Sequence, residues 1–425
     1  MLVWSNPGSQ RGEAGRIGHA LSSSTGTDDK RSLASAGVDF ELSDDQEAIR
    51  GAVRELAARF DDDYWRERDA RHEFPWDFYA AFAEHGWLGI AIPERWGGGA
   101  LGIAEAGLLL EEVAASGAAM SGCSALHLTI FGINPVVRHG SDELRDRILP
   151  RAVSGELHVA FGVTEPDAGL DTARITTFAR RERGGYRVSG HKVWTSKALE
   201  AEKVLLLTRT TALADCARRT DGMTLFLADL DRDHVDIRPI EKMGRHAVDS
   251  NELFIDGLFV AEADRVGAEG QGFRYLLDGL NPERILIAHE AIGIGRAALR
   301  RAVAYANERV VFGRPIGANQ GVAFPLARAL ADLDAAELVA RQAAWRYDRD
   351  LDCAREANTA KLLAAEAGWA AADAAVQTHG GYGYAAEYHV ERYFREARLM
   401  RIAPISQEMV LNYLCEHVLG LPRSY

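Results

Sequence analysis

The sequence predicts an α+β chain in which two helical segments flank a central β segment. Apolar residues recur at helical spacing towards both ends of the chain, and they alternate with polar residues in its middle part. We therefore expect a helical domain at residues 38–155, a β domain at 156–268 and a second helical domain at 269–425. Residues 1–37 are rich in Gly and Ser and lack an apolar period, so we predict a disordered extension there.

The first helical segment contains two clear helix patterns. Ile49, Val53, Leu56 and Phe60 lie at the spacing of one helical face. The stretch 103–120 is rich in Ala, Leu and Glu, which are strong helix formers. Both patterns predict helices that bury one face against the rest of the domain.

The central segment is predicted to be a compact β domain. Its short runs of alternating or continuous apolar residues are bounded by turn residues, which is typical of strands. The runs are YRVSGHKVW (186–194), KVLLLTRT (203–210), GMTLFLADL (222–230), VDIRPI (235–240) and NELFIDGLFV (251–260).

Long helical patterns return in the last segment, at 273–309, 325–347 and 356–379. One of them contains GIGRAA (293–298), which superficially matches a dinucleotide-binding glycine loop. No strand precedes these glycines, and they lie inside a helical pattern, so we interpret them as sites of close helix packing.

Composition limits the classes of function. The chain has 425 residues and a formal net charge of −13, from 49 basic and 62 acidic side chains. Binding to nucleic acid needs clustered positive charge, so this balance favours a small-molecule enzyme. The four cysteines are far apart, which predicts neither a zinc site nor a disulfide framework. Apolar runs are too short to span a bilayer, and we expect a cytoplasmic protein.

Three separated segments carry the functional signal. They are GVTEPDAGLDTA (162–173), RVVFGRPIGANQ (309–320) and QTHGGYGYAAEYHVERYFRE (377–396). The chain resembles the acyl-CoA dehydrogenase family, whose two signature segments match the first and third, with support from IPERWGGGAL (92–101) and GHKVWTS (190–196). The resemblance spans roughly residues 40 to 425. It implies FAD as cofactor, a C-terminal four-helix bundle and a homotetramer.

The first segment would form one wall of the flavin site. Taken alone it is equally typical of a β-turn, because Pro, Asp and Gly are preferred turn residues. A flavin must bury a flat ring while N–H groups and a hydroxyl satisfy its heteroatoms, which these residue types can do. By resemblance, the residues at the flavin are Phe161, Val163, Thr164, Gly169, Trp194, Ser196 and Ser406. Gly169 would permit close backbone approach, whereas Trp194, at a strand end, would otherwise suggest a core residue.

The second and third segments would bind the FAD diphosphate and adenosine of a neighbouring subunit. The residues implied are Arg309, Phe312, Gln320, Gln377, Gly380 and Gly381. A planar guanidinium suits a pyrophosphate, and paired glycines let backbone amides approach it. The alternative is a surface Arg beside a flexible loop. The resemblance requires at least a dimer.

The catalytic base is absent from its usual place. Family chemistry removes the α proton of an acyl-CoA thioester while the β hydrogen leaves as hydride. Many members carry the required glutamate 27 residues after the glutamine of the third segment, and here that residue is Pro404. In relatives the backbone N–H at this position polarises the thioester carbonyl, and proline has none. We expect a shifted loop in which a neighbouring amide, such as that of Ile405, donates instead; Ile405 itself replaces the family's usual glycine.

Some members, such as isovaleryl-CoA and long-chain acyl-CoA dehydrogenases, place the glutamate on a helix of the C-terminal half. In this chain GLNPERILIA (279–288) puts Glu283 at that position, which makes it the candidate base. The alternative is structural: Asn281 would cap the helix, Pro282 would be its first residue and Glu283 would face its positive end.

Three further residues would contact CoA by resemblance: Leu170, Asn281 and Arg284. Leu170 replaces a serine that contacts the pantetheine in relatives, and Arg284 could equally form a structural ion pair. The charged stretch 387–396 is interpreted as a solvated helix face.

The function implied is FAD-dependent α,β-dehydrogenation of an acyl-CoA to the trans-2-enoyl-CoA, with electron-transfer flavoprotein as acceptor. Two rivals stay open. A related flavin oxidase or monooxygenase would tolerate loss of the usual glutamate. A flavin-binding member that binds nucleic acid is disfavoured by the acidic balance.

Overall fold

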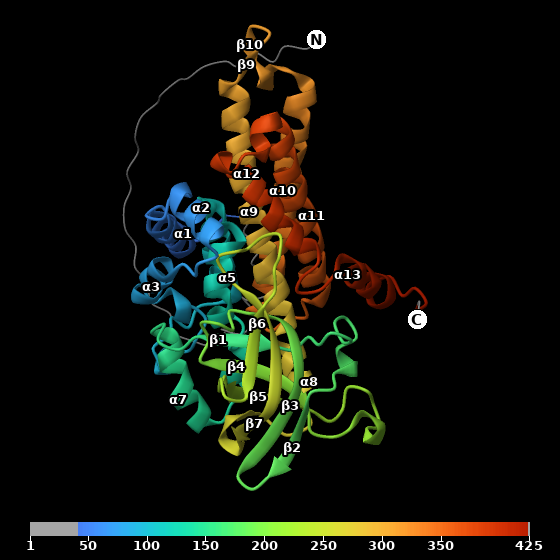
Figure 1. The fold of residues 1–425 in the computed structure, drawn as a ribbon. Helices are drawn as coiled ribbons and strands as arrows, with labels where there is room; N and C mark the ends of the chain where they lie inside the picture. Colours follow the sequence, from blue (N-terminus) through green and yellow to red (C-terminus); the bar gives the residue numbers. More distant parts are fainter. Residues whose placement is uncertain (1–40, 424–425) are drawn as a thin grey trace, which may run out of the picture. The chain divides into compact units, whose positions relative to one another are not determined.

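The structure is a computed structural model that describes residues 41–423. The predicted disordered extension at 1–37 lies outside the described residues. Residues 42–423 belong to one compact unit. Its elements follow the predicted order of helices, then strands, then helices (Figure 1).

In the described part of the chain, seven α-helices precede the first strand. They are α1 (Asp44–Ala57), α2 (Asp62–Arg71), α3 (Trp76–Glu84), α4 (Ile103–Val113), α5 (Ala119–Ile130), α6 (Asn134–His139) and α7 (Asp142–Val153). α1 begins with a capping box, in which Ser43 Oγ accepts from the Gln46 amide and the Gln46 side chain accepts from the Ser43 amide. The pattern predicted over 103–120 forms α4 and then a π-helical turn at Ala114–Ala118, where Gly117 has φ 109°.

The helical stretch Ile103–His139 is long and apolar enough to pass for a membrane span, but 94% of that window is buried inside the protein. It is therefore part of the core. α4 and α5 pack against α9 (Leu280–Glu308) of the C-terminal helices, so these two helices join the halves of the helical core.

The β domain is built on an eight-stranded sheet with the order β6-β7-β3-β2-β4-β5-β8, and β1 pairs in parallel with β4. The strands are β1 (Val159–Gly162), β2 (Phe178–Glu182), β3 (Gly185–Ser196), β4 (Lys203–Arg209), β5 (Met223–Asp229), β6 (Val235–Pro239), β7 (Ser250–Ala261) and β8 (Arg265–Val266). The five predicted runs form β3 to β7, whereas β1, β2 and β8 were not predicted. Long antiparallel ladders join β3 to β7 and β4 to β5.

β4 explains why one run is apolar throughout. Leu205 and Leu207 pack on one face with residues of α7, while Val204 and Leu206 pack on the other with residues of β3 and β7. A strand that is buried on both faces needs no polar alternation.

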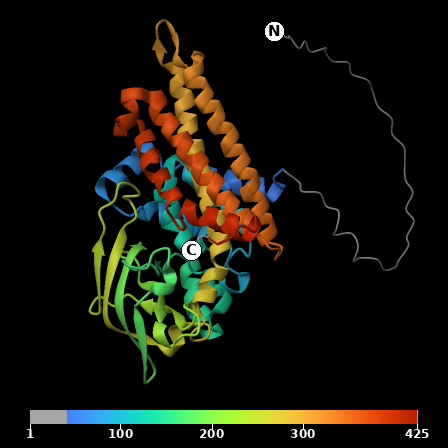
Figure 2. The same ribbon diagram turned by 90° about the vertical axis from the view of Figure 1, so that its right-hand side faces the viewer.

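The C-terminal helices are α8 (Gly272–Asp278), α9 (Leu280–Glu308), α10 (Gln320–Tyr347), α11 (Ala354–His379), α12 (Val390–Ala397) and α13 (Gln407–Tyr413). α9, α10 and α11 are long and α12 packs against α9 and α11, which gives the predicted bundle (Figures 1 and 2). The hairpin β9 (Val310–Val311) and β10 (Arg314–Pro315) joins α9 to α10.

The helix predicted over 273–309 is broken at Gly279, which separates α8 from α9. Pro282 supplies the reason, because proline lacks an N–H and fits only the first turn of a helix. The N-cap is Gly279, so the alternative that Asn281 caps this helix and Pro282 is its first residue is wrong.

The glycines of GIGRAA are confirmed as sites of close packing. A Cβ on Gly293 would lie 2.3 Å from the carbonyl oxygen of Glu111 in α4. On Gly295 a Cβ would lie 2.7 Å from the Leu333 side chain and 3.0 Å from the backbone of Gly368. Any larger residue would therefore separate α9 from its neighbours.

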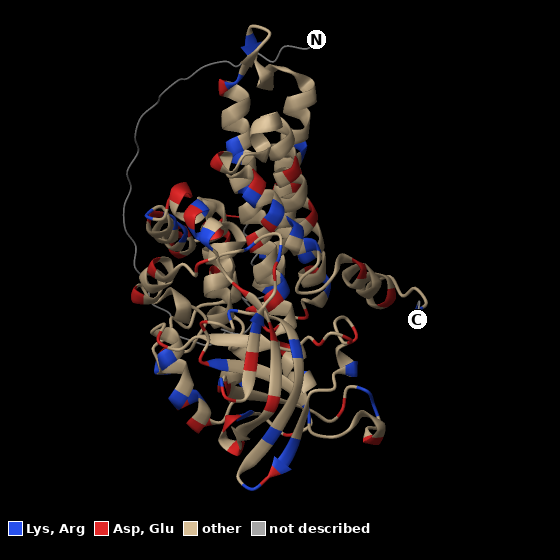
Figure 3. Ribbon diagram, viewed as in Figure 1, with Lys and Arg blue, Asp and Glu red and all other residues tan. Residues whose placement is uncertain are grey.

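The interpretation of the charged stretch 387–396 as a solvated face is wrong. Arg392 and Glu396 of α12 are buried, Glu396 accepts hydrogen bonds from the amide and hydroxyl of Ser121, and Arg392 donates to the carbonyl of Gly117. These charges face inward because they satisfy the backbone at the π-helical turn. Elsewhere acidic and basic residues are mixed over helices and strands (Figure 3).

Candidate active site

Glu283 lies in the first turns of α9, and its side chain is partly exposed. Burial raises the pKa of its carboxyl to about 7; Arg284 opposes this shift and Glu290 adds to it. A carboxyl that titrates near neutral pH can accept a proton and release it again, which is the behaviour expected of a general base.

A buried pair lies two turns further along the same face of α9. Glu290 Oε1 is 2.8 Å from Nδ1 of His127 on α5, and both side chains are buried. Residues seven apart share a helical face, so Glu290 stands on the Glu283 side of α9. This pair was not predicted, because its two residues are 163 positions apart in the sequence.

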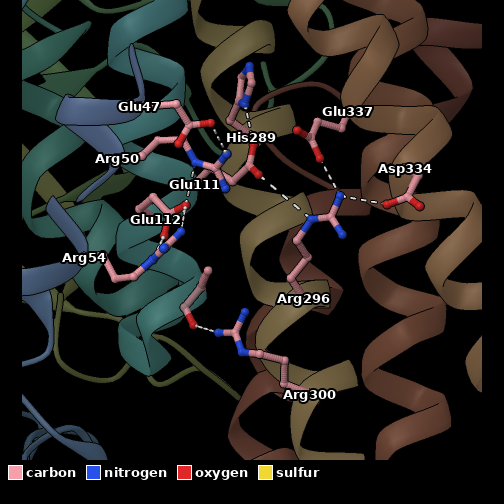
Figure 4. Close-up of polar contacts among 11 residues, drawn as sticks. Glu47, Arg50, Arg54, Glu111, Glu112, His289, Arg296, Arg300, Asp334 and Glu337 are labelled. Atoms are coloured by element: carbon pink, nitrogen blue, oxygen red, sulfur yellow. Dashed lines mark hydrogen bonds and ion pairs between the residues drawn. The ribbon is translucent and has the colours of Figure 1, made fainter. Parts of the chain in front are cut away.

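α9 is held rigidly by a polar network on its other faces (Figure 4). His289 Nδ1 is 2.7 Å from Glu111 of α4, and Arg296 pairs with Asp334 and Glu337 of α10. Arg300 donates to the carbonyl of Ala115. Glu112 of α4 is tied in turn to Arg50 and Arg54 of α1. The candidate base therefore projects from a helix fixed to α4 and α10.

The predicted flavin wall is held by a buried ion pair. Lys192 Nζ of β3 is 2.9 Å from Glu165 and donates to the carbonyl of Val163 at 3.0 Å. Burial opposes ionisation of Glu165, but Lys192, the amide and hydroxyl of Thr176 and the amide of Thr177 donate to its carboxylate and lower its pKa to about 2. Burial lowers the pKa of Lys192 to about 8. At pH 7 both groups are therefore charged.

This ion pair joins the turn after β1 to β3 and brings the two predicted flavin segments together. The Val193 amide also donates to the Thr164 carbonyl at 2.9 Å. Trp194 is 57% exposed, and Thr164 and Ser196 are partly exposed. A Cβ on Gly169 would meet nothing within 4 Å. An exposed aromatic ring with hydroxyls and open backbone beside it fits a flat ring with a polar edge.

Phe161 lies on β1 and is partly buried, and Val163 follows that strand. Ser406, the remaining predicted flavin residue, is the N-cap of α13, where its hydroxyl accepts from the Met409 amide at 3.3 Å.

A second site lies at the far end of α9. A cleft of about 580 Å³ is lined by residues that include Arg309, Tyr305, His379, Gly380 and Gly381. Nothing lies within 4 Å of a Cβ built on either glycine. The second and third sequence motifs are thus brought together, and an arginine beside open glycine backbone suits a diphosphate.

The other residues predicted for the diphosphate and adenosine lie on exposed surface. Phe312 is fully exposed at the tip of the β9–β10 hairpin, and Gln320 and Gln377 are exposed as well. In one chain this end of α9 is far from the flavin wall. Twenty-six residues separate Glu283 from Arg309 along α9, which is about 39 Å at 1.5 Å per residue.

Two of the three predicted CoA contacts, Asn281 and Arg284, lie beside the candidate base on α9. Arg284 Nη1 donates to Asn281 Oδ1 at 3.0 Å, and within the described residues no carboxylate lies within ion-pair distance of Arg284, although the charge of Glu283 acts on it. Leu170 is 61% exposed on the flavin-wall turn. The Arg284 guanidinium is therefore positioned by its hydrogen bond to Asn281. It does not form the structural ion pair that was considered as the alternative.

The loop at Pro404 is anchored from α11. Lys361 Nζ donates to the carbonyl of Ile405 at 2.6 Å. Burial lowers the pKa of Lys361 to about 8, with a further contribution from the charge of Arg284. Lys361 was not predicted, since a lysine inside an Ala-rich helix pattern carries no recognisable sequence signal.

Comparison with known proteins agrees with this geometry. Models of the acyl-CoA dehydrogenase N-terminal, middle and C-terminal domains match residues 43–156, 160–258 and 270–419. The chain is 39% identical over 390 residues to acyl-CoA dehydrogenase FadE12 of Mycobacterium tuberculosis, covering 91% of this chain and 99% of that one. It is 33% identical over 387 residues to benzylmalonyl-CoA dehydrogenase of Aromatoleum aromaticum, covering 90% and 100%.

Among solved structures, butyryl-CoA dehydrogenase of Megasphaera elsdenii matches with a TM-score of 0.83 at 27% identity, covering 88% of this chain and 97% of that one. A glutaryl-CoA dehydrogenase in complex with glutaryl-CoA matches with a TM-score of 0.84 at 28% identity, covering 91% and 98%. The three domain models cover most of the described chain in the order of its helical, β and helical parts. The chain therefore belongs to the acyl-CoA dehydrogenase family.

Proposed function

We propose that this protein is an FAD-dependent acyl-CoA dehydrogenase that converts an acyl-CoA thioester to the trans-2-enoyl-CoA, with Glu283 as the base. The observation that carries the proposal is the Glu283 carboxyl, whose pKa is raised to about 7 by burial. It stands on a rigid helix at the position where some family members hold their glutamate. Family membership supports FAD as cofactor.

In this proposal Glu283 accepts the α proton at its carboxylate while the β hydrogen leaves with its electron pair, and a carbon–carbon double bond forms between the two positions. Bound FAD supplies the two-electron acceptor. Thr164, Trp194 and Ser196 would hold the ring, since they combine exposed apolar surface with hydroxyl groups. Arg284, fixed by Asn281, would attract the anionic CoA towards the base.

The thioester carbonyl also needs donors, because its polarisation acidifies the α proton. Pro404 has no N–H. Our hypothesis is that the Ile405 amide donates, in a loop that Lys361 holds by the Ile405 carbonyl. A structure with bound acyl-CoA that shows no protein N–H near the thioester oxygen would contradict it.

We further propose that a complete FAD site needs two chains. Arg309 and its glycines lie about 39 Å along α9 from Glu283, so the diphosphate and adenosine residues of one copy would serve the flavin wall of another. A homotetramer, electron-transfer flavoprotein as acceptor, a role in fatty acid metabolism and a cytoplasmic location complete the proposal by analogy with the family.

The test is anaerobic bleaching of the flavin absorbance by a panel of acyl-CoAs. Wild type should bleach, whereas Glu283→Gln should bind acyl-CoA and not bleach. Glu84→Gln, an exposed carboxyl on α3, is the control and should behave as wild type. Equal bleaching by Glu283→Gln would exclude it as the base, and no bleaching by any protein would exclude the dehydrogenase. Rapid reoxidation of the reduced enzyme by air alone would favour the oxidase or monooxygenase.

A further inference from the structure

A buried arginine stands beside the predicted flavin wall. Arg245, in the loop between β6 and β7, is only 9% exposed. Its guanidinium donates to three serine hydroxyls: Nη1 to Ser124 at 3.2 Å, and Nη2 to Ser196 at 3.0 Å and Ser250 at 2.5 Å. Within the described part of the chain no carboxylate forms an ion pair with it.

This arrangement is costly, which points to a role beyond packing. Arginine stays charged in proteins, and burying a charge without an ion-pair partner is unfavourable. Burial lowers the pKa of Arg245, and the more distant charges of Asp249, Glu396 and Glu290 act against that shift. The charge is therefore kept in the interior although neutral donors could bond the same hydroxyls.

The backbone around these residues is strained in the same place. Arg245 has φ 59°, and Trp194 and Lys197, which flank Ser196, both have φ 62°. Such φ values are unfavourable for residues other than glycine, and they cluster where function fixes a conformation. Two loops from different parts of the sequence thus meet at Ser196 with their geometry imposed by the fold.

The hydrogen bond from Arg245 also fixes the direction of the Ser196 hydroxyl. A guanidinium can only donate, so Ser196 Oγ must accept. The hydrogen of that hydroxyl is then directed elsewhere. Ser196 is partly exposed at the end of β3, next to the exposed Trp194, so the free hydrogen is available to a ligand on this wall.

We propose that Arg245 is a positioning residue for the flavin. It holds the Ser196 hydroxyl as a donor to the ring, and its fixed positive charge favours electron transfer to the ring by stabilising the negative charge of the reduced form. The inference rests on the flavin site of the proposed function, but not on the identity of the acyl substrate. If Arg245 only joined α5, β3 and β7 through its hydrogen bonds, the fold would need its donor groups and not its charge.

The test separates charge from donors. Arg245→Gln removes the charge and keeps an amide donor. Arg245→Lys keeps the charge but loses the planar, forked arrangement of N–H donors that a guanidinium provides. Arg238→Gln is the matched control, because it removes the same charge from an exposed arginine in the preceding strand, paired with Asp236. Each protein is loaded with FAD, and its FAD content, midpoint potential and affinity for sulfite, which adds to oxidised flavin as an anion, are measured without acyl-CoA.

Arg245→Gln should have a more negative potential and bind sulfite about tenfold more weakly, which corresponds to about 1.4 kcal/mol. Arg245→Lys and Arg238→Gln should stay close to wild type in both. The proposal is overturned if Arg245→Gln holds FAD and matches wild type. If Arg245→Gln holds no FAD, Arg245→Lys tests the proposal in its place. A wild-type midpoint potential in Arg245→Lys supports a role for the positive charge. Loss of FAD from Arg245→Lys, or a lower potential despite the retained charge, overturns the proposal.

These readouts are independent of dehydrogenation. Wild type that fails to oxidise any acyl-CoA would refute the proposed function and leave the effect of Arg245 on the flavin measurable.

Discussion

Lowering the pH from 8 to 6 should remove most of the proton-accepting form of Glu283. Its pKa of about 7 is set first by burial, which Arg284 opposes and Glu290 reinforces. With that value, about nine-tenths of the carboxyl is ionised at pH 8, half at pH 7 and about one-tenth at pH 6. The rate of flavin bleaching should therefore fall about tenfold between pH 8 and pH 6.

The assay is anaerobic rapid mixing of enzyme with subsaturating acyl-CoA across this pH range at constant ionic strength. Subsaturating substrate reports the pKa of the free enzyme, to which the structure corresponds. Glu283→Gln should bleach about 10²- to 10⁴-fold more slowly. Its rate should also lose the fall between pH 8 and pH 6, which is the acidic limb of the pH–rate profile. Glu84→Gln should reproduce the wild-type profile.

A wild-type rate that is equal at pH 6 and pH 8 would refute the reasoning. So would a limb near pH 4.5, because it would show that the fold does not raise the pKa of the base.

Three other predictions follow from the same structure. Glu290→Gln removes a negative charge that raises the pKa of the base, so the acidic limb should move to lower pH; a shift to higher pH would contradict this. Lys192→Met leaves Glu165 buried without its cation and should lower the free energy of unfolding by about 3–5 kcal/mol in urea titrations, whereas an unchanged midpoint would show that the pair is not a structural tie. Because the folded pKa of Glu165 is about 2, its contribution in wild type is present above its unfolded pKa of about 4.5 and is lost as the pH falls towards 2. Arg309→Gln should weaken FAD retention about 10- to 100-fold through the loss of a charged hydrogen bond; FAD content after gel filtration measures this, with Arg314→Gln on the same hairpin as the control that should keep its FAD.

The sequence was most informative where a local pattern has a local cause. The alternation in 186–194 predicts β3 because side chains in a strand point alternately to opposite faces. Pro282 also predicts a nearby helix start, because proline restricts where a helix can begin, but α9 begins two residues earlier, at Leu280. Short strands such as β1 and β8 escaped prediction because four or fewer residues carry too little periodicity.

The burial of charged side chains was not predicted where it depends on partners far away in the sequence. In 387–396, Glu396 is buried because Ser121, 275 positions away, supplies its donors. The Lys192–Glu165 pair escaped for the same reason, since neither residue shows in sequence that its partner lies across a turn and a strand.

The sequence by itself determined the α+β class, the order of helical, β and helical parts, the family and the candidate base, because each depends on local periodicity or a short motif. Only the tertiary structure decided the raised pKa of Glu283, the buried charge of Arg245 at Ser196 and the separation of Glu283 from Arg309 along α9. These properties arise from desolvation and from distances between residues far apart in the chain, and both exist only once the chain has folded.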